Sequence, residues 1–261
     1  MNDNAPLQGR HALVTGGGRG IGASIARALA ARGARVTLLG RTAQTLEALA
    51  AEFESTGMQS FCVTADVTQR DSLDAAFAAA RVRLGRIDIL VNNAGQAVSG
   101  PITKRDDALW EKMLAVNLTG TYFGIQAVLP DMIQGDFGRI VNVASTAGLT
   151  GYPYVAAYCA AKHGVIGLTR AVAREVAMRN ITVNAVCPGY TDTDLVREAA
   201  AKISAVTGRK LDEAIQAMTK VNPQGRLIRP DEVAHTVAWL CMPGCESVTG
   251  QSIVVAGGEL M

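Results

Sequence analysis

The chain alternates between short apolar runs and longer alanine-rich segments over its 261 residues. In a strand with one solvent-exposed face, polar and apolar residues alternate. The apolar runs lack this alternation, so each is expected to be buried on both faces. Buried strands separated by helices are typical of a parallel sheet covered by helices on both sides. The seven predicted strands are 11–16, 35–40, 60–66, 87–95, 138–145, 181–189 and 252–258.

The segments between these runs predict helices. Helical spacing occupies 20–33, 42–56, 69–84, 106–133 and 155–179. Because no linker or low-complexity tract interrupts the pattern, residues 1–261 are predicted to form a single Rossmann-like α/β domain with a doubly wound parallel sheet. Residues 190–230 interrupt the alternation of strands and helices after the sixth strand. We call this long segment the excursion and interpret it as a substrate lid.

A glycine-rich loop, TGGGRGIG, lies between the first predicted strand and the first predicted helix. Gly16 is expected to permit a sharp turn, Gly20 to let a pyrophosphate approach the helix N-terminus, and Gly22 to allow close helix–sheet packing. A glycine motif alone is weak evidence, but its strand–turn–helix context favours dinucleotide binding. The predicted cofactor contacts of this loop are Gly16, Gly18, Arg19, Gly20, Ile21 and Gly22.

The end of the second predicted strand indicates which dinucleotide is bound. In NAD-binding folds an acid near this point usually accepts the ribose hydroxyls, but here Arg41 follows Gly40 and no carboxylate is present. Arg41 and the nearby Arg19 can hold a 2′-phosphate through charge-assisted bonds, which favours NADP(H) over NAD(H). The alternative is that both arginines are solvated surface charges.

Further signals follow the glycine loop in order along the chain. They are Asp66, the run Asn92-Asn93-Ala94-Gly95, Asn117, Ser145, the pair Tyr158-x-x-x-Lys162, and Pro188-Gly189. This joint pattern resembles the short-chain dehydrogenase/reductase family from about residue 8 to residue 258. The resemblance implies an NAD(P)-dependent oxidoreductase that forms a homotetramer or homodimer, and the chain is similar to the ketoreductases that act on 3-oxoacyl thioesters and polyketides.

The resemblance also implies three further groups of cofactor contacts. The adenine ring is contacted by Asp66 and Val67. The turn beside the adenine ribose consists of Asn93, Ala94 and Gly95. The nicotinamide carboxamide or the phosphates are held by Pro188, Gly189, Thr191 and Thr193. The amides of the NNAG run, that of Asn92 in particular, can instead tie neighbouring strands together.

The spacing of Tyr158 and Lys162 predicts the chemistry. Residues four apart share a helix face, so both side chains can enter one cleft. Hydride transfer to a ketone leaves an alkoxide that needs a proton, and a nearby ammonium lowers the pKa of a tyrosine toward neutrality. We expect Tyr158 to donate this proton, and Lys162 to stabilise the phenolate and bond the nicotinamide ribose.

Ser145 and Asn117 complete the predicted catalytic set. Ser145 ends the fifth strand at the carboxyl edge of the sheet, where such folds bind ligands, and its hydroxyl can hold the substrate oxygen. Asn117 resembles the family's water-holding residue, which would link Lys162 to solvent as a proton relay. Taken alone, Ser145 could be a strand-end cap and Asn117 a buried structural amide. No metal site is predicted.

The substrate is less constrained than the chemistry. We favour reduction of a 3-oxoacyl thioester or related ketone; the alternatives are a secondary-alcohol or hydroxysteroid-type dehydrogenase acting oxidatively and a non-catalytic cofactor-sensing protein. Tyr152 and Tyr154 either line the substrate pocket or belong to a surface loop. The lid cations, which either attract a carrier-bound acyl thioester or are simply solvated, are Arg197, Lys202, Arg209 and Lys210.

Charge and cysteine usage argue against several other classes of protein. Lys and Arg number 25 against 23 Asp and Glu, without a basic run, so no nucleic-acid partner is expected. No apolar run reaches the roughly 18 residues that span a bilayer, and the first ten residues, MNDNAPLQGR, do not resemble a secretory signal. The five scattered cysteines lack zinc spacing, so we expect buried free thiols and a cytoplasmic protein.

Overall fold

A seven-stranded sheet runs through the centre of the computed structural model, which describes residues 5–208 and 210–261. The strand order is β3-β2-β1-β4-β5-β6-β7, and every neighbouring pair is parallel. The predicted doubly wound α/β fold is therefore confirmed. The strands are β1 (His11–Thr15), β2 (Arg35–Gly40), β3 (Ser60–Thr64), β4 (Ile89–Asn92), β5 (Gly138–Val143), β6 (Ile181–Pro188) and β7 (Ser252–Val255).

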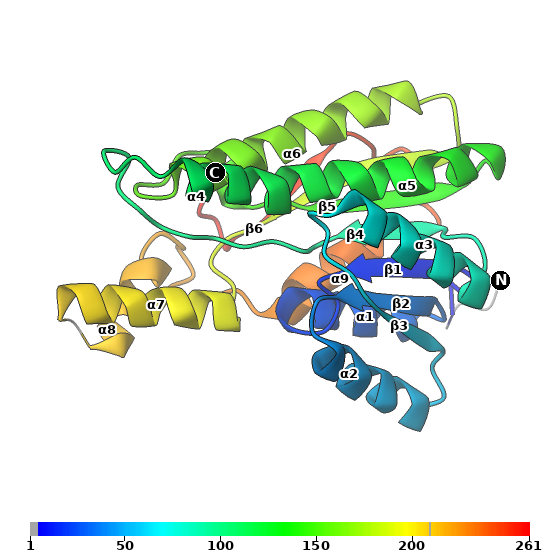
Figure 1. The fold of residues 1–261 in the computed structure, drawn as a ribbon, viewed down its shortest axis with the longest axis horizontal. Helices are drawn as coiled ribbons and strands as arrows, with labels where there is room; N and C mark the ends of the chain where they lie inside the picture. The colour runs from blue at the N-terminus through cyan, green and yellow to red at the C-terminus, as the bar shows by residue number, and fades with distance from the viewer. Residues whose placement is uncertain (1–4, 209) are drawn as a thin grey trace.

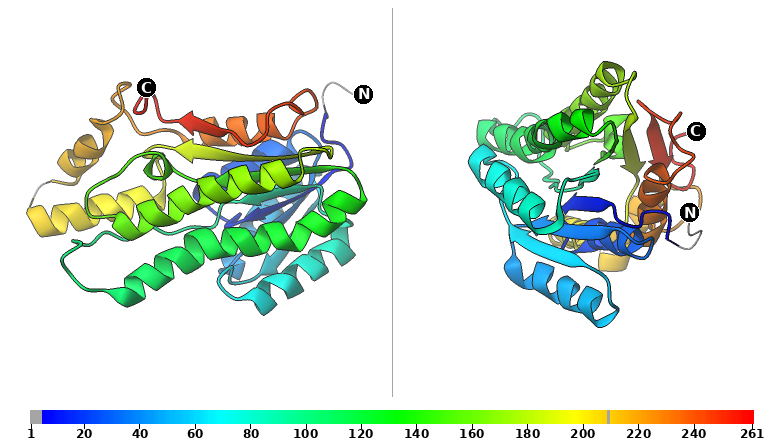
Figure 2. Two further views of the ribbon diagram at one scale, coloured as in Figure 1. Left: turned by 90° about the horizontal axis from the view of Figure 1, so that it is seen from above. Right: turned by 90° about the vertical axis from the view of Figure 1, so that its right-hand side faces the viewer.

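Helices cover both faces of this sheet (Figures 1 and 2). One apolar core joins one face to α1, α2 and α9 and includes Ile25 and Val237; the other joins the opposite face to α3, α5 and α6 and includes Phe77 and Val128. Each of these helices buries one apolar stripe, which is the pattern of an amphipathic helix on a sheet. The helices are α1 (Gly20–Ala30), α2 (Ala43–Ser55), α3 (Arg70–Leu84), α4 (Asp107–Leu114), α5 (Gly120–Gln134), α6 (Ala156–Glu175), α7 (Asp194–Thr207), α8 (Leu211–Thr219) and α9 (Pro230–Leu240).

Four predicted strands extend two or three residues too far toward their carboxyl ends. The prediction gave 60–66, 87–95, 138–145 and 252–258, whereas β3 ends at Thr64, β4 at Asn92, β5 at Val143 and β7 at Val255. Side-chain hydrogen bonds capture the backbone beyond two of these points: the Thr68 N–H donates to Asp66 (2.9 Å) and the Asn93 N–H to the Thr15 hydroxyl (3.0 Å). These turns take the polar residues out of the sheet and onto its edge.

The single helix predicted over 106–133 is interrupted. A π-helical segment, Ala115–Thr119, separates α4 from α5 and contains Asn117. The Asn117 amide donates to the main-chain oxygen of Met113 (3.0 Å), and the Thr121 hydroxyl donates to the main-chain oxygen of Asn117 (3.2 Å). Single π turns of this kind occur frequently at functional sites.

The excursion after β6 forms α7 and α8, which project beyond the end of the sheet (Figure 1). A parallel bridge between Thr191 and Ile228 joins the two ends of the excursion at its base. The role of this segment as a lid stays a prediction. Of its four cations, Arg197 pairs with Asp192 at 2.8 Å, and Arg209 lies outside the described residues.

Among the described residues, no helix combines the length and apolarity needed to cross a bilayer. The five cysteines are free thiols. Cys187, Cys241 and Cys245 are buried as expected, but Cys62 and Cys159 are only partly buried. The expectation of buried thiols therefore applies to three of the five.

Candidate active site

The strand order reverses between β1 and β4, and folds of this kind form a crevice for the ligand at that point. From β1 the chain continues through β2 to β3 on one side, and from β4 through β5 to β7 on the other. In open parallel sheets, ligands bind outside the carboxyl ends of the strands at such a reversal. The predicted segments that follow β1, β4, β5 and β6 all leave the sheet at this one edge.

The glycine loop after β1 is held by Asn93. Its amide donates to the main-chain oxygens of Thr15 (2.9 Å) and Gly16 (3.2 Å). Gly16 has a positive φ of 64°, and a Cβ on Gly22 would lie 2.1 Å from the Gly16 oxygen, so a side chain at Gly22 is sterically excluded. Asn92 is different, because it is buried and donates to Asn142 Oδ1 at 2.9 Å, which ties β4 to β5.

The glycine loop leads directly into the N-terminus of α1. Helix α1 begins at Gly20, with no acidic residue in its first turn and no side-chain cap from the described residues. The unpaired N–H groups of a helix start form an anion site. A Cβ on Gly20 would lie 3.3 Å from the Thr193 methyl group, and Arg19 lies 3.9 Å from Asp194. The segment after β6 therefore borders this loop.

Arg41 lies exposed at the end of β2 and acts electrostatically on Asp66 at the end of β3. Burial works to raise the pKa of Asp66, but hydrogen bonds from Thr68 and the charge of Arg41 hold it below its ordinary value. The Val67 side chain is buried, and a Cβ on Gly120 would lie 3.0 Å from it. This side chain belongs to the core, so its backbone is the part of Val67 that can face the crevice.

Tyr158 and Lys162 lie one turn apart on α6, near Ser145 at the end of β5. Tyr158 is hydrogen-bonded to Ser145, whose Oγ also accepts from the Ala147 N–H at 3.1 Å. Lys162 is only 4% exposed, and its Nζ donates to the main-chain oxygen of Val143 at 2.8 Å. That Nζ lies 5.6 Å from the centroid of the Tyr158 ring. The structure thus brings three of the four predicted catalytic side chains together.

The pKa values of Tyr158 and Lys162 differ from the expectation. Burial raises the pKa of Tyr158 to about 12, although its bond with Ser145 opposes the shift. Burial lowers the pKa of Lys162 to about 8. Loss of water disfavours the charged form of both groups, and in the protein alone this effect outweighs the attraction between ammonium and phenolate that we expected to lower the pKa of Tyr158.

Asn117, the fourth predicted catalytic residue, is fully buried. Its amide donates to the main-chain oxygen of Gln96 (2.9 Å), and its Oδ1 accepts from the Gln96 N–H (3.1 Å). A Cβ on Gly95 would lie 2.8 Å from Asn117 Oδ1 and 3.7 Å from Lys162 Nζ, which places the three residues side by side. The side chain of Asn117 therefore fastens the loop after β4 to the π-helical segment between α4 and α5.

Three hydrogen bonds hold the start of the segment after β6 in place. Gly189 donates its N–H to Val255 (3.1 Å), the Thr191 hydroxyl donates to Gly189 (3.0 Å), and the Thr193 hydroxyl donates to Thr191 (3.2 Å). Pro188 ends β6 opposite Val255 of β7. These contacts fix the path of the loop across the crevice toward the glycine loop.

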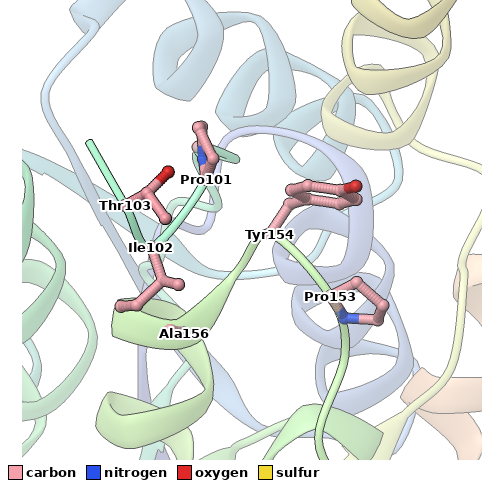
Figure 3. Close-up of a pocket in the computed structure, with 7 residues that line it drawn as sticks. Pro101, Ile102, Thr103, Pro153, Tyr154 and Ala156 are labelled. Atoms are coloured by element: carbon pink, nitrogen blue, oxygen red, sulfur yellow. The ribbon is translucent and has the colours of Figure 1, made fainter.

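A pocket of about 420 Å³ opens between the loop after β4 and the loop before α6 (Figure 3). Tyr154 lines it, with a positive φ of 67° that is uncommon for a residue with a side chain, and its carbonyl accepts from the Gly100 N–H at 2.8 Å. Tyr152 lies elsewhere and donates its hydroxyl hydrogen bond to Glu259. The residues that line the pocket are Gly100, Pro101, Ile102, Thr103, Pro153, Tyr154 and Ala156.

Sequence reasoning missed several groups at this edge. The carbonyl of Val143 and the backbone of Gln96 carry no side-chain signal, so neither contact could be read from residue types. Tyr190 and Glu259 were also missed. Glu259 did carry a signal, because it is a single acid in an otherwise apolar C-terminal stretch.

Comparisons with known proteins agree with this geometry. The family model described as short chain dehydrogenase matches residues 10–204. A Streptomyces coelicolor protein provisionally named a ketoacyl reductase is 40% identical over 249 residues, which is 95% of each chain. A 3-oxoacyl-acyl-carrier-protein reductase of Aquifex aeolicus is 38% identical over 253 residues, covering 97% of this chain and 98% of the relative.

A solved structure also matches. A variant of actinorhodin polyketide ketoreductase, crystallised with NADPH, superimposes with a TM-score of 0.92 at 39% identity, covering 96% of this chain and 97% of the other. The matches in sequence and in structure extend over nearly the same length of the chain. The chain therefore belongs to the short-chain dehydrogenase family, as its ordered motifs predicted.

Proposed function

We propose that this protein is an NADPH-dependent ketoreductase that converts a ketone into the secondary alcohol. The substrate that we favour is a 3-oxoacyl thioester or a related ketone. The observation that carries the proposal is the convergence of Tyr158, Ser145 and Lys162 at the edge of the sheet that also holds the glycine loop. Relatives named as ketoacyl and 3-oxoacyl-carrier-protein reductases support this class of substrate.

The crevice fits a dinucleotide with an extra phosphate. The uncapped start of α1 offers N–H groups to a pyrophosphate, and Arg41 and Arg19 offer charge to a 2′-phosphate. The solved relative that contains NADPH supports this choice over NADH. When bound, NADPH supplies the hydride that adds to the carbonyl carbon of the substrate. The contacts that we assign around it are those predicted after β1, β2, β3, β4 and β6.

Tyr158 donates its phenolic proton to the carbonyl oxygen in this proposal. Because its pKa is raised to about 12, the phenol keeps its proton at neutral pH and is ready to act as an acid, which suits the reductive direction. The Ser145 hydroxyl, which shares a hydrogen bond with Tyr158 in the structure, turns its O–H to the same carbonyl oxygen in this proposal when a ketone binds. Lys162, anchored on Val143, places its positive charge behind the phenol.

In this scheme the side chain of Asn117 does not react but positions the loop beside Lys162. Its side-chain amide is occupied by Gln96 and Met113. We assign any water that relays a proton toward Lys162 to the main-chain oxygen of Asn117, which lies in the π-helical segment. The side chain holds the loop carrying Gly95 against Lys162.

The test compares the wild type with Tyr158→Phe in an assay of NADPH oxidation by a 3-oxoacyl thioester. Loss of a general acid lowers rates by about 10²- to 10⁴-fold, while the Kd for NADPH should stay within about threefold of the wild type because the phenol oxygen alone is lost. Tyr122→Phe removes a phenol hydroxyl of α5 outside the proposed active site, keeps the ring, and serves as the matched control. Wild type that binds NADPH but reduces no ketone would favour the cofactor-sensing alternative.

We also propose a homotetramer. Large apolar side chains are exposed on two sets of elements: Trp110 and Tyr122 on α4 and α5, and Trp239 and Val254 on α9 and β7. Two such surfaces on one chain can each bury a two-fold contact, which yields a closed tetramer. Sedimentation equilibrium measures the mass directly, and a monomer at micromolar concentration would contradict the proposal.

A further inference from the structure

The C-terminal segment turns back toward the active site after β7. Gly257 and Gly258 have positive φ angles of 61° and 93°. A Cβ on Gly257 would lie 2.1 Å from Asn222 Oδ1, and a Cβ on Gly258 would lie 3.3 Å from Pro223. Only glycine suits these two positions, because the chain passes directly against the base of the excursion. The turn delivers the next residue, Glu259, to the end of β6.

Glu259 is placed there with few partners. One carboxylate oxygen accepts a hydrogen bond from the Tyr152 hydroxyl. The other, Oε2, is buried and has no hydrogen-bond partner among the described residues. It lies against Gly189, where a Cβ would be 2.6 Å away, but the Gly189 N–H already donates to Val255. In the described part of the chain, no Lys or Arg forms an ion pair with Glu259.

The surroundings of Glu259 connect it to the reacting groups. Tyr152 is hydrogen-bonded to Thr146, the residue after Ser145. The ring of Tyr190 meets that of Tyr152 edge to face at 6.4 Å and 75°. Tyr190 is also close enough to interact electrostatically with both Tyr158 and Glu259. Two aromatic rings and a carboxylate therefore form one wall beside the catalytic tyrosine, and we call Tyr152, Tyr190 and Glu259 the acidic wall.

Glu259 is partly buried, and its unpaired Oε2 is buried, so its negative charge acts on any charged substrate beside it. Such a charge is weakly screened, so it repels an anion and attracts a cation more strongly than a surface carboxylate does. The two rings offer apolar contact area with a preference for flat or neutral groups. Neither ring carries a charge that compensates Glu259.

We propose that the acidic wall makes this enzyme select neutral and cationic ketones and reject ketones that carry a carboxylate near the carbonyl. Glu259 is the residue that sets this selectivity. The inference rests on the proposed reductase function and deepens it, since it specifies the charge of the substrate. The acyl portion of a thioester substrate is accordingly expected to be uncharged.

The test uses pairs of ketones that differ only in charge. One pair is the N-acetylcysteamine thioester of 3-oxoadipic acid and its terminal carboxamide; the other is 4-acetylbenzoate and 4-acetylbenzamide, with 4-(aminomethyl)acetophenone as the cation. We expect wild-type kcat/KM to favour each amide over its carboxylate by at least about tenfold, a difference of about 1.4 kcal/mol. Glu259→Gln should raise kcat/KM for the carboxylates about tenfold and leave the amides within about threefold.

Two control variants show whether the effect comes from the charge of Glu259 itself. Tyr152→Phe retains the charge of Glu259 and should keep the discrimination, whereas Glu175→Gln removes an exposed carboxylate of α6 and should change nothing. The Kd for NADPH and the melting temperature report whether each variant is folded.

The outcomes are separable. Equal wild-type rates for amide and carboxylate would overturn the acidic wall without any variant, as would a Glu259→Gln protein that alters all substrates by the same factor. Failure of the wild type to reduce either amide would instead contradict the proposed reductase function, and the charge selectivity with it.

Discussion

The Nζ of Lys162 donates to the main-chain oxygen of Val143 at 2.8 Å, so the ammonium is fastened to β5. The carbonyl is a fixed acceptor in the sheet, and α6 carries Tyr158 one turn before Lys162. This contact sets where the charge sits relative to the phenol. It also buries the amine, whose pKa falls to about 8.

The lowered pKa of Lys162 predicts a pH-dependent stability. The group titrates at 10.5 when unfolded and at about 8 when folded, so between these values the unfolded chain binds more protons. The contribution of Lys162 to the free energy of unfolding therefore rises with pH across this window, by about 3 kcal/mol at most. Urea unfolding of the wild type and of Lys162→Met at pH 7.5, 8.5 and 9.5 isolates this contribution. The free energy of unfolding of the wild type minus that of Lys162→Met should increase as the pH rises. Parallel profiles would contradict the burial of a charged amine.

The same titration predicts a pH limit for reduction. Free enzyme loses the Lys162 ammonium as pH rises through about 8, and with it the charge behind Tyr158. We expect kcat/KM, which reports the free enzyme, to fall above this pH. If Lys162→Arg retains measurable activity, its descending limb should move upward, because a guanidinium stays charged. A limb that is the same in both proteins would assign the titration to another group.

Arg41→Asp should change the choice of cofactor. Arg41 is exposed at the end of β2, and the substitution replaces attraction for a 2′-phosphate by repulsion. We expect the Kd for NADPH to rise at least about tenfold and that for NADH to change by less than about threefold, measured by fluorescence titration. Arg83→Asp, at the far end of α3, has the same charge change and is the control. Equal weakening of both cofactors by Arg41→Asp would sink the 2′-phosphate assignment.

Two glycine substitutions test the packing of the cofactor loop. Gly22→Ala places a Cβ 2.1 Å from the main-chain oxygen of Gly16, whereas Gly167→Ala on α6 meets nothing within 4 Å. The first should abolish measurable NADPH binding and lower the melting temperature. The second should be neutral or stabilise the protein by up to about 1 kcal/mol, because alanine is the better helix former. Tight NADPH binding by Gly22→Ala would show that the loop can relax.

Asn117→Ala should act first on stability. The change removes both hydrogen bonds between the side chain and Gln96 and the bond to Met113. Leaving buried backbone groups unpaired costs about 1–3 kcal/mol each, so we expect the free energy of unfolding to fall by about 2–4 kcal/mol. Urea unfolding without cofactor measures this loss. Unchanged stability together with a large loss of kcat would instead point to a direct chemical role for the side chain.

The amino-acid sequence by itself determined the fold class, the family and most of the candidate site. Local patterns can be recognised from the sequence alone. Those used here are the strand and helix periodicity, the glycine turn and the four-residue spacing of Tyr158 and Lys162. The order of the motifs then pointed to the short-chain dehydrogenase family, which the comparisons bear out. The ends of the strands were harder to predict, because side chains such as that of Asp66 accept backbone hydrogen bonds there and end the strand pairing.

Only the tertiary structure decided how these residues work together. Lys162 finds its partner in a carbonyl of β5, Val67 turns its side chain into the core, and the π-helical turn at Asn117 breaks a helix that its sequence favours. The position of Glu259 beside Gly189, at the end of β6, depends on a contact between Gly257 and Asn222 that no local sequence pattern predicts. Contacts between segments far apart in the chain, and the water they exclude, set the pKa values of Tyr158 and Lys162.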